Sequence, residues 1–170
     1  KSLGLQKISN KIIKICKGKF FLRLDADDWL ENTAIKNMVE VFQKKKNIGA
    51  VYGNYYYANE DGNVIGYEKN LNIIKKHVAP HGACTMYKVN DLKKVDGYFT
   101  DVKAQDGWDA WLKLRDNIKY FYLKRPIFYY RQHQQSLTKT KKNILKERAK
   151  IFNKMAKKNF VKRKAITAVI

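Results

Sequence analysis

The segment KFFLRLDADD, residues 19–28, joins a short apolar run to three carboxylates. The run contains two phenylalanines and predicts a buried strand. A helix is expected after it, with Ile35, Met38, Val39 and Phe42 on one face. Strand-like and helical stretches alternate in the same way through the first half of the chain, which predicts the α/β class.

Two of these carboxylates, Asp25 and Asp27, stand directly after the apolar run. Residues two apart in an extended chain point the same way, so both side chains can converge on one point. Open α/β sheets bind ligands beyond the carboxyl ends of their strands. Oxygen ligands suit Mg²⁺ or Mn²⁺, which usually share a site with phosphates. The alternative is that the acids cap the following helix, and the spacing of Asp28 and Glu31 favours this for Asp28.

Other elements can be placed outward from this segment by periodicity, turn residues and β-forming composition. A helix is expected over 3–16 and a strand over 49–58, and Asp61-Gly62 predicts a hairpin. The remaining elements are a return strand (63–67), a strand (84–89), helices (90–95 and 106–116), two strands (119–123 and 126–131) and a basic helix from residue 141.

Two further segments carry side chains that can do chemistry. In GYFTDVKAQDGWDAWLKL, residues 97–114, Asp106 stands at a helix start, where it is either a cap or a general base. Asp109 and Lys113 have the spacing of a surface ion pair. Near the end of the second segment, YYRQHQQSLT (129–138), Arg131 and His133 are either structural or serve a diphosphate, with His133 also a candidate metal ligand.

In order, these motifs resemble those of the family-two glycosyltransferases, whose GT-A fold is a nucleotide-sugar-binding α/β sheet. LDADD (24–28) matches the family's metal motif, and QDGWDAW (105–111) is similar to its acceptor-side motif ED-x-x-D-x-W. YRQH (130–133) matches its Y-R-x-H motif, and GYF (97–99) its GGF/GYF signature. The resemblance covers about residues 4–138.

The resemblance implies a GT-A-like mixed sheet flanked by helices. It also implies an inverting transfer from a nucleotide-diphosphate sugar to a hydroxyl of a glycan or lipid-linked acceptor, in surface polysaccharide or lipopolysaccharide synthesis. The residues that it assigns are Asp27, Asp25 and His133 to Mg²⁺ or Mn²⁺, Asp106 to the general base, Asp25, Arg131 and His133 to the diphosphate, and His81, Gly82 and Trp108 to the acceptor.

The chain departs from the family pattern in two places. Gln105 stands where many members have Glu. The family's opening portion, with its first strands and the acid that grips the nucleobase, is expected to be missing, so the fold is incomplete at the N-terminus. We therefore expect a partial glycosyltransferase domain at 1–138, a basic helical tail at 139–164, and at 165–170 a buried strand that starts a second domain.

The charge is strongly positive, with 36 Lys and Arg against 15 Asp and Glu, or a formal net charge of +21. Residues 139–164 are the most basic stretch, and Ile144, Ile151, Phe152 and Met155 form a stripe that can face the body or a bilayer. This tail is either a solvated helix or a contact for an anionic membrane surface. No apolar run approaches the ~20 residues of a membrane span. A cytoplasmic location is expected, with peripheral contact at the inner membrane face as the further expectation.

Three rival functions remain open. Nucleotidyl transfer also uses paired aspartates, but it needs a Gly-rich phosphate loop that the sequence lacks. A basic nucleic-acid-binding module is disfavoured because the sequence carries no RNP, KH, zinc or helix-turn-helix motif. The third is a transferase fragment without activity.

Overall fold

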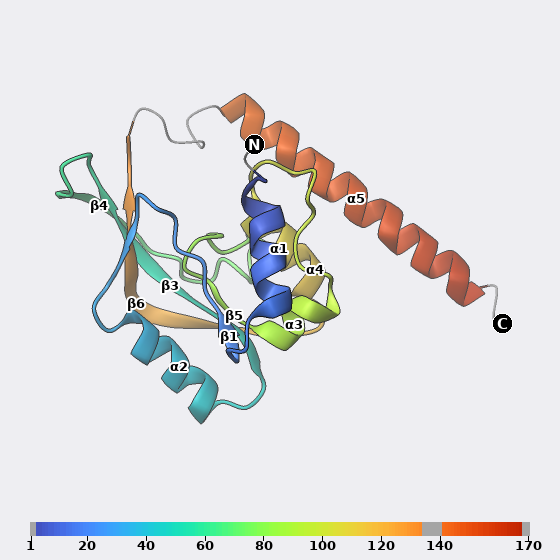
Figure 1. Ribbon diagram of the computed structural model, residues 1–170, viewed down its shortest axis with the longest axis horizontal. Helices are drawn as coiled ribbons and strands as arrows, with labels where there is room; N and C mark the ends of the chain where they lie inside the picture. Colours follow the sequence, from blue (N-terminus) through green and yellow to red (C-terminus); the bar gives the residue numbers. More distant parts are fainter. Residues whose placement is uncertain (1–2, 134–140, 168–170) are drawn as a thin grey trace.

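Two long strands, β3 (Ile48–Ala58) and β6 (Lys119–Arg131), form the centre of the sheet. In the computed structural model, which describes residues 3–133 and 141–167, they pair in parallel from Ile48–Lys119 to Ala58–Arg131. The other pairings are antiparallel, in the order β1-β5-β3-β6-β2, with β4 on β3 (Figure 1). The short strands are β1 (Phe20–Phe21), β2 (Trp29–Leu30), β4 (Val64–Glu68) and β5 (Met86–Lys88). The α/β class and the mixed sheet are therefore confirmed.

Helices cover both faces of this sheet. Successive residues of β3 point to opposite faces, so its apolar side chains contact helices on each side. Val51 packs with Met38 of α2 (Ala34–Lys44), whereas Ala50 packs with Leu92 of α3 (Val89–Lys94). The second cluster also includes Ile13 of α1 (Leu5–Ile15) and residues of α4 (Asp106–Leu114). Eight consecutive residues of β3 are buried, as expected for a strand covered on both faces.

The two strands expected at 119–123 and 126–131 are one strand, β6, with an irregularity between them. Leu123 is opposite Gly53 and Pro126 is opposite Asn54, so Lys124 and Arg125 bulge out of the ladder. Pro126 is tolerated there because a bulge releases its residues from pairing. A Cβ at Gly53 would come within 2.9 Å of the Arg125 carbonyl oxygen, so the bulge requires glycine on the facing strand.

The segment of the three carboxylates is less regular than expected. Only Phe20 and Phe21 pair as a strand, although the N–H of Cys84 still donates to the Arg23 carbonyl at 2.8 Å. The cap prediction for Asp28 is wrong. Helix α2 begins at Ala34, and Asp28 Oδ1 instead accepts a hydrogen bond of 2.9 Å from the N–H of Arg131. The intervening Trp29 and Leu30 form β2 against the end of β6.

The pair Asp109–Lys113 is also not a surface pair. The side chains are 1% and 4% exposed and lie 2.8 Å apart. Lys113 donates to the Gly97 carbonyl at 2.7 Å, and Asp109 accepts from the N–H of Phe99. The pair therefore holds the GYF turn to α4. Burial raises the pKa of Asp109 and lowers that of Lys113, while their mutual attraction opposes both shifts.

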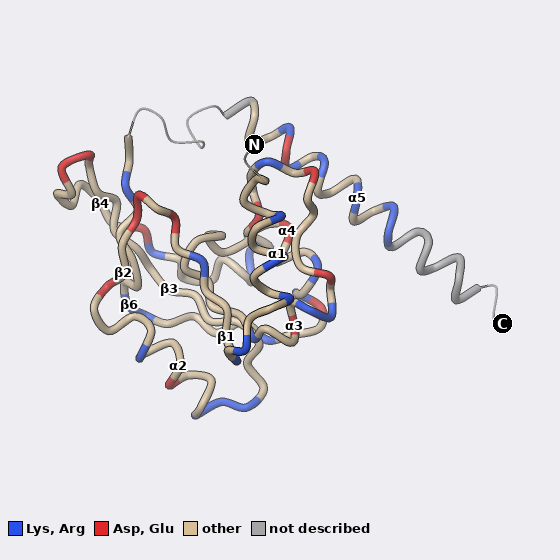
Figure 2. The backbone as a smooth tube through the Cα atoms, viewed as in Figure 1, with Lys and Arg blue, Asp and Glu red and all other residues tan. Residues whose placement is uncertain are grey.

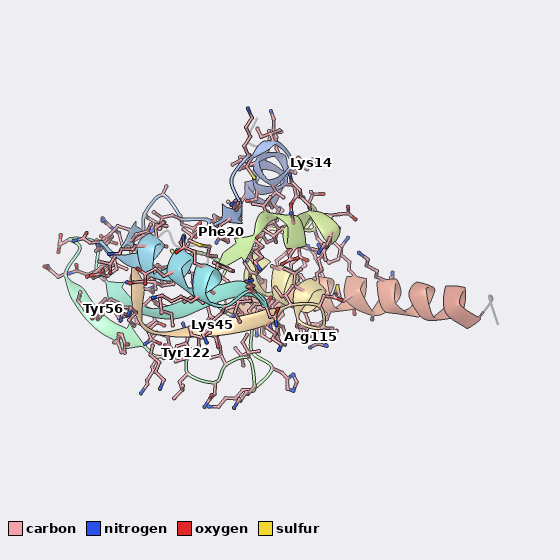
Figure 3. All side chains as sticks on the ribbon, turned by 90° about the horizontal axis from the view of Figure 1, so that it is seen from below. Lys14, Phe20, Lys45, Tyr56, Arg115 and Tyr122 are labelled. Carbon is pink, nitrogen blue, oxygen red and sulfur yellow. The ribbon has the colours of Figure 1, made fainter. Side chains whose placement is uncertain are left out.

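The basic tail forms helix α5 (Lys141–Thr167), which packs against the body and then projects beyond it (Figures 1 and 3). Ile151 is fully buried with Val102, Trp111 and Leu112, and Met155 packs beside them. Ile151 and Met155 of the apolar stripe therefore face the body, whereas Phe152 is 43% exposed. Lys and Arg recur along the part of α5 that Figure 2 colours.

The final strand expected from Ala165 is contradicted where the structure describes it, because residues 165–167 belong to α5. Residues 168–170 lie outside the described part of the chain, as do residues 134–140, which end the third motif and begin the tail. No helix among the described residues is long and apolar enough to span a membrane.

Candidate active site

A cavity of about 650 Å³ opens where the segments after β1, β4 and β6 meet the start of α4. Its lining contains seven of the eight site residues that the sequence predicts: Asp25, Asp27, His81, Gly82, Asp106, Trp108 and His133. Segments far apart in the chain thus bring their polar side chains to one place. Such a concave site with converging polar groups is the usual form of a substrate pocket.

Asp27 and His133 join the first and third motifs. His133 Nε2 lies 2.8 Å from Asp27 Oδ2, and the Asp27 side chain is 40% exposed. Asp25 lies next to them, and its carboxylate is 3.2 Å from Arg23 Nε. Burial raises the pKa of Asp25, with Arg23 opposing the shift and Asp106 and Asp27 adding to it.

Arg23 connects this pair of acids to Asp106. Its Nη1 lies 2.7 Å from Asp106 Oδ2, and the two side chains are only 12% and 13% exposed. Burial alone would lower the pKa of Arg23, but the charges of Asp106 and Asp25 outweigh it and raise the pKa. Asp106 is the first residue of α4, and its carboxylate is used for this ion pair.

The loop from Pro80 to Gly82 packs directly on the start of α4. A Cβ at Gly82 would overlap the Asp106 carboxylate, and one at Gly107 would lie 2.6 Å from the Pro80 carbonyl oxygen. His81 stacks among aromatic rings, with its ring centre 4.8 Å from that of Tyr130. Burial lowers the pKa of His81, which favours the neutral ring. The loop thus forms the wall beside Asp106.

Helix α5 supplies another part of the wall. Arg148 donates from Nη2 and Nε to Gln105 Oε1, at 2.7 and 3.0 Å, and its guanidinium lies 4.6 Å from the centre of the Trp108 ring. Gln105 has a left-handed backbone (φ 68°) at the N-cap of α4, which turns the chain into Asp106. The basic tail is therefore part of the site.

Arg131 is the predicted site residue that the cavity lining does not include. Its guanidinium lies 5.2 Å from the Trp29 ring centre and donates to the Glu60 carbonyl at 3.0 Å. Its backbone N–H binds Asp28, whose pKa burial raises to about 7. In this arrangement Arg131 holds the hairpin and β2 together.

The sequence reasoning missed four charged residues of the cavity: Arg23, Glu68, Lys103 and Arg148. Arg23 could have been suspected, because a cation inside an apolar run needs a partner, and Asp25 follows two residues later. Arg148 could not be distinguished from the other cations of its basic stretch.

The cavity offers few ligands to a divalent cation. Among the described residues, no group of three or more His, Cys, Asp and Glu is arranged to hold a metal. Asp25 and Asp27 nevertheless present carboxylate oxygens to the cavity. Mg²⁺ commonly takes only one or two carboxylates and completes its shell with phosphates and water. The residues fit a cation that is bound together with a diphosphate.

Comparison with known proteins defines the class. The chain is 27% identical over 128 residues to chondroitin synthase of Pasteurella multocida, which covers 72% of the chain and 13% of that protein. It is 28% identical to hyaluronan synthase of Pasteurella multocida, with the same two shares. The crystal structure of S. aureus TarS 1–349 in complex with UDP-GlcNAc superimposes with a TM-score of 0.55 at 19% identity, covering 79% of this chain and 41% of that one.

The superposition shows that the chain has the GT-A-like mixed sheet of that structure. The model of the family described as Glycosyl transferase family 2 matches residues 1–101, and the chain belongs to this family. The chain spans only about an eighth of the two curated relatives named above.

Proposed function

We propose that this chain carries the catalytic site of an inverting glycosyltransferase that moves a sugar from a nucleoside-diphosphate sugar to a hydroxyl of a glycan or lipid-linked acceptor. Surface polysaccharide synthesis is the process that we propose for it. The observation that carries the proposal is the convergence of Asp25, Asp27, Asp106 and His133 in one cavity. The similarity to polysaccharide synthases, and to a fold solved with UDP-GlcNAc, supports the donor class.

In the proposed reaction, Asp106 takes the proton from the acceptor hydroxyl. The hydroxyl oxygen then forms a bond to the anomeric carbon from the face opposite the diphosphate. The bond between that carbon and the diphosphate oxygen breaks, the electron pair leaves with the diphosphate, and the configuration inverts. Arg23 keeps the Asp106 carboxylate in place through the ion pair of 2.7 Å.

The departing diphosphate is the other group that must be stabilised. Asp27 and Asp25 would hold Mg²⁺ or Mn²⁺, with His133 as a further ligand or as the donor that orients Asp27. A divalent cation there neutralises the charge of the leaving group. Because the Arg131 guanidinium contacts the Trp29 ring and donates to the Glu60 carbonyl, we assign the diphosphate contact to His133. His81, Gly82 and Trp108 remain our assignments for the acceptor side.

We place the enzyme in the cytoplasm, with the exposed cations of α5 against an anionic inner membrane surface. The supporting observation is that Lys146, Lys157 and Lys158 are exposed, whereas Ile151 is buried and Met155 is half-buried. Contact through these lysines would be electrostatic.

Transfer from UDP-sugars to oligosaccharide acceptors, with Mg²⁺, Mn²⁺ or EDTA, tests the proposal. Asp27→Asn should remove most activity, whereas Asp61→Asn, the same change in the exposed hairpin turn, should leave it intact. EDTA should abolish the wild-type reaction, and Mg²⁺ or Mn²⁺ should restore it. Full activity of Asp27→Asn in EDTA would rule out the metal role.

A further inference from the structure

Seven charged residues line the cavity: the acids Asp25, Asp27, Glu68 and Asp106, and the cations Arg23, Lys103 and Arg148. The charge of Arg23 is neutralised by its ion pairs with Asp25 and Asp106. We call Lys103 and Arg148, together with the Trp108 ring, the cationic wall.

The positive charge of Arg148 is not balanced by an acid. Its hydrogen bonds go to the neutral amide oxygen of Gln105, and none of the described carboxylates forms an ion pair with it. The adjacent Glu147 is buried. Its carboxylate forms an ion pair with the ammonium of Lys150 and accepts a hydrogen bond from the backbone N–H of Lys103. Burial lowers the pKa of Arg148, as for a cation without a partner acid, whereas Arg23 beside two acids shows the opposite shift.

The cationic wall lies on the acceptor side of the proposed reaction. Gln105, to which Arg148 is bonded, is the residue before Asp106, and Trp108 is on the first turn of the same helix. The diphosphate and its cation, in contrast, would lie at Asp25 and Asp27. Among the described contacts of Arg148, the N–H of Nε and one N–H of Nη2 are directed to Gln105, so the two N–H groups of Nη1 and the second one of Nη2 remain for a ligand.

We propose that the cationic wall recognises an anionic group, carboxylate or phosphate, on the acceptor chain. The assignment to the acceptor rests on the proposed function. An arginine held on an aromatic ring is well suited to this role because its planar donors match both kinds of oxyanion. The acceptor of this enzyme is therefore an acidic polymer.

Binding of three oligomers of equal length tests this: a uronic-acid oligosaccharide, a polyol-phosphate oligomer and a neutral N-acetylhexosamine oligosaccharide. Wild-type protein, saturated with UDP, should prefer one or both of the acidic probes in calorimetry. Arg148→Gln should lower the affinity for the preferred acidic probe by about tenfold, which is the loss expected when a hydrogen bond to a charged group is removed. The neutral probe should be unaffected, and whichever acidic probe is preferred identifies the source of the charge.

Gln105→Glu tests the charge of Arg148. It keeps Arg148 bonded in the same place but neutralises its charge, so affinity for the acidic probe should fall at least as far as in Arg148→Gln. Arg115→Gln is the matched control, because Arg115 (Figure 3) stacks on Trp111 in the same way, at 4.9 Å, outside this cavity.

Four results would overturn the inference: no preference of the wild type for an acidic probe, binding of none of the three, equal losses for neutral and acidic probes in Arg148→Gln, or wild-type binding by Gln105→Glu. A fall in UDP affinity of Arg148→Gln, with acceptor binding unchanged, would place the charge on the donor and also overturn it. Failure of the proposed function would appear separately, as absence of sugar transfer by protein that still discriminates between the probes.

Discussion

Arg23 and Asp106 form an ion pair of 2.7 Å in the floor of the cavity, and the same guanidinium lies 3.2 Å from Asp25. One side chain thus joins the segment that would hold the cation to the residue that would take the proton. The spacing between these two groups is consequently fixed by a buried contact.

Replacing Arg23 by Gln should destabilise the protein strongly. Removing one partner of a buried ion pair typically costs about 3–5 kcal/mol, because it leaves the other charge buried and unpaired. The pKa of Asp25, already raised by burial, should rise further without the opposing charge. Urea unfolding measures the loss. Arg23→Lys, which keeps the charge, should lose less, and an unchanged midpoint for Arg23→Gln would contradict the role of the pair.

Asp106→Asn should lower kcat by about 10²–10⁴-fold, the range typical of a general base. Donor affinity should remain nearly unchanged, because the substitution affects the acceptor side. The carboxylate is bound to Arg23 at the start of α4, so circular dichroism should confirm that the helix persists. Steady-state kinetics together with donor titration give both numbers. Collapse of donor binding would make Asp106 a structural residue.

Asp28→Asn should change how stability depends on pH. Burial raises the pKa of Asp28 from 3.8 to about 7, so between these values the folded protein holds a proton that the unfolded chain releases. The contribution of Asp28 to stability therefore falls as pH rises from about 4 to 7. Asn cannot ionise, and it can still accept from the Arg131 N–H.

Relative to the wild type, Asp28→Asn should become more stable as pH rises, by up to about 4 kcal/mol above pH 7. Chemical unfolding of both proteins at pH 5, 6, 7 and 8 measures this difference. A constant difference across that range would show that Asp28 does not titrate there.

The exposed lysines of α5 give a prediction about membranes. Replacing Lys146, Lys157 and Lys158 by Gln should weaken binding to vesicles rich in anionic lipid, because each cation near such a surface contributes about 1 kcal/mol. Added salt should release the wild type, and neutral vesicles should bind neither protein. These point variants are preferable to removing the helix, which would uncover the pocket of Val102, Trp111 and Leu112. Equal co-sedimentation of both proteins would exclude a membrane role for these cations.

Four of the predicted residues that line the cavity each belong to a short local motif. Asp25 and Asp27 follow an apolar run, Asp106 starts a helix and His133 ends an aromatic strand, so local patterns were sufficient. Apolar spacing predicted the boundaries of α1 and α4 to within two residues, whereas α2 begins at Ala34 and not directly after Asp28.

What could not be predicted depends on contacts between distant segments. Asp109 and Lys113 look like a surface pair, but packing of the GYF turn buries them. Asp28 has the spacing of a helix cap, yet the end of β6 lies close enough to bind it instead. The cationic wall needs α5 to fold back onto the loop before Asp106, and no local pattern indicates that return.

The parallel pairing of β3 with β6 has a consequence for how the chain acquires its structure. The two strands are separated in sequence by β4, β5, α3 and α4, so the central ladder cannot form until that whole stretch has been closed into a loop. In non-local pairing of this kind, the chain loses the conformational entropy of loop closure before the contacts between the strands can form. Folding should therefore be slow compared with that of helical proteins of similar size. Until β6 pairs with β3, the apolar faces of β3 remain exposed and can associate with non-native segments.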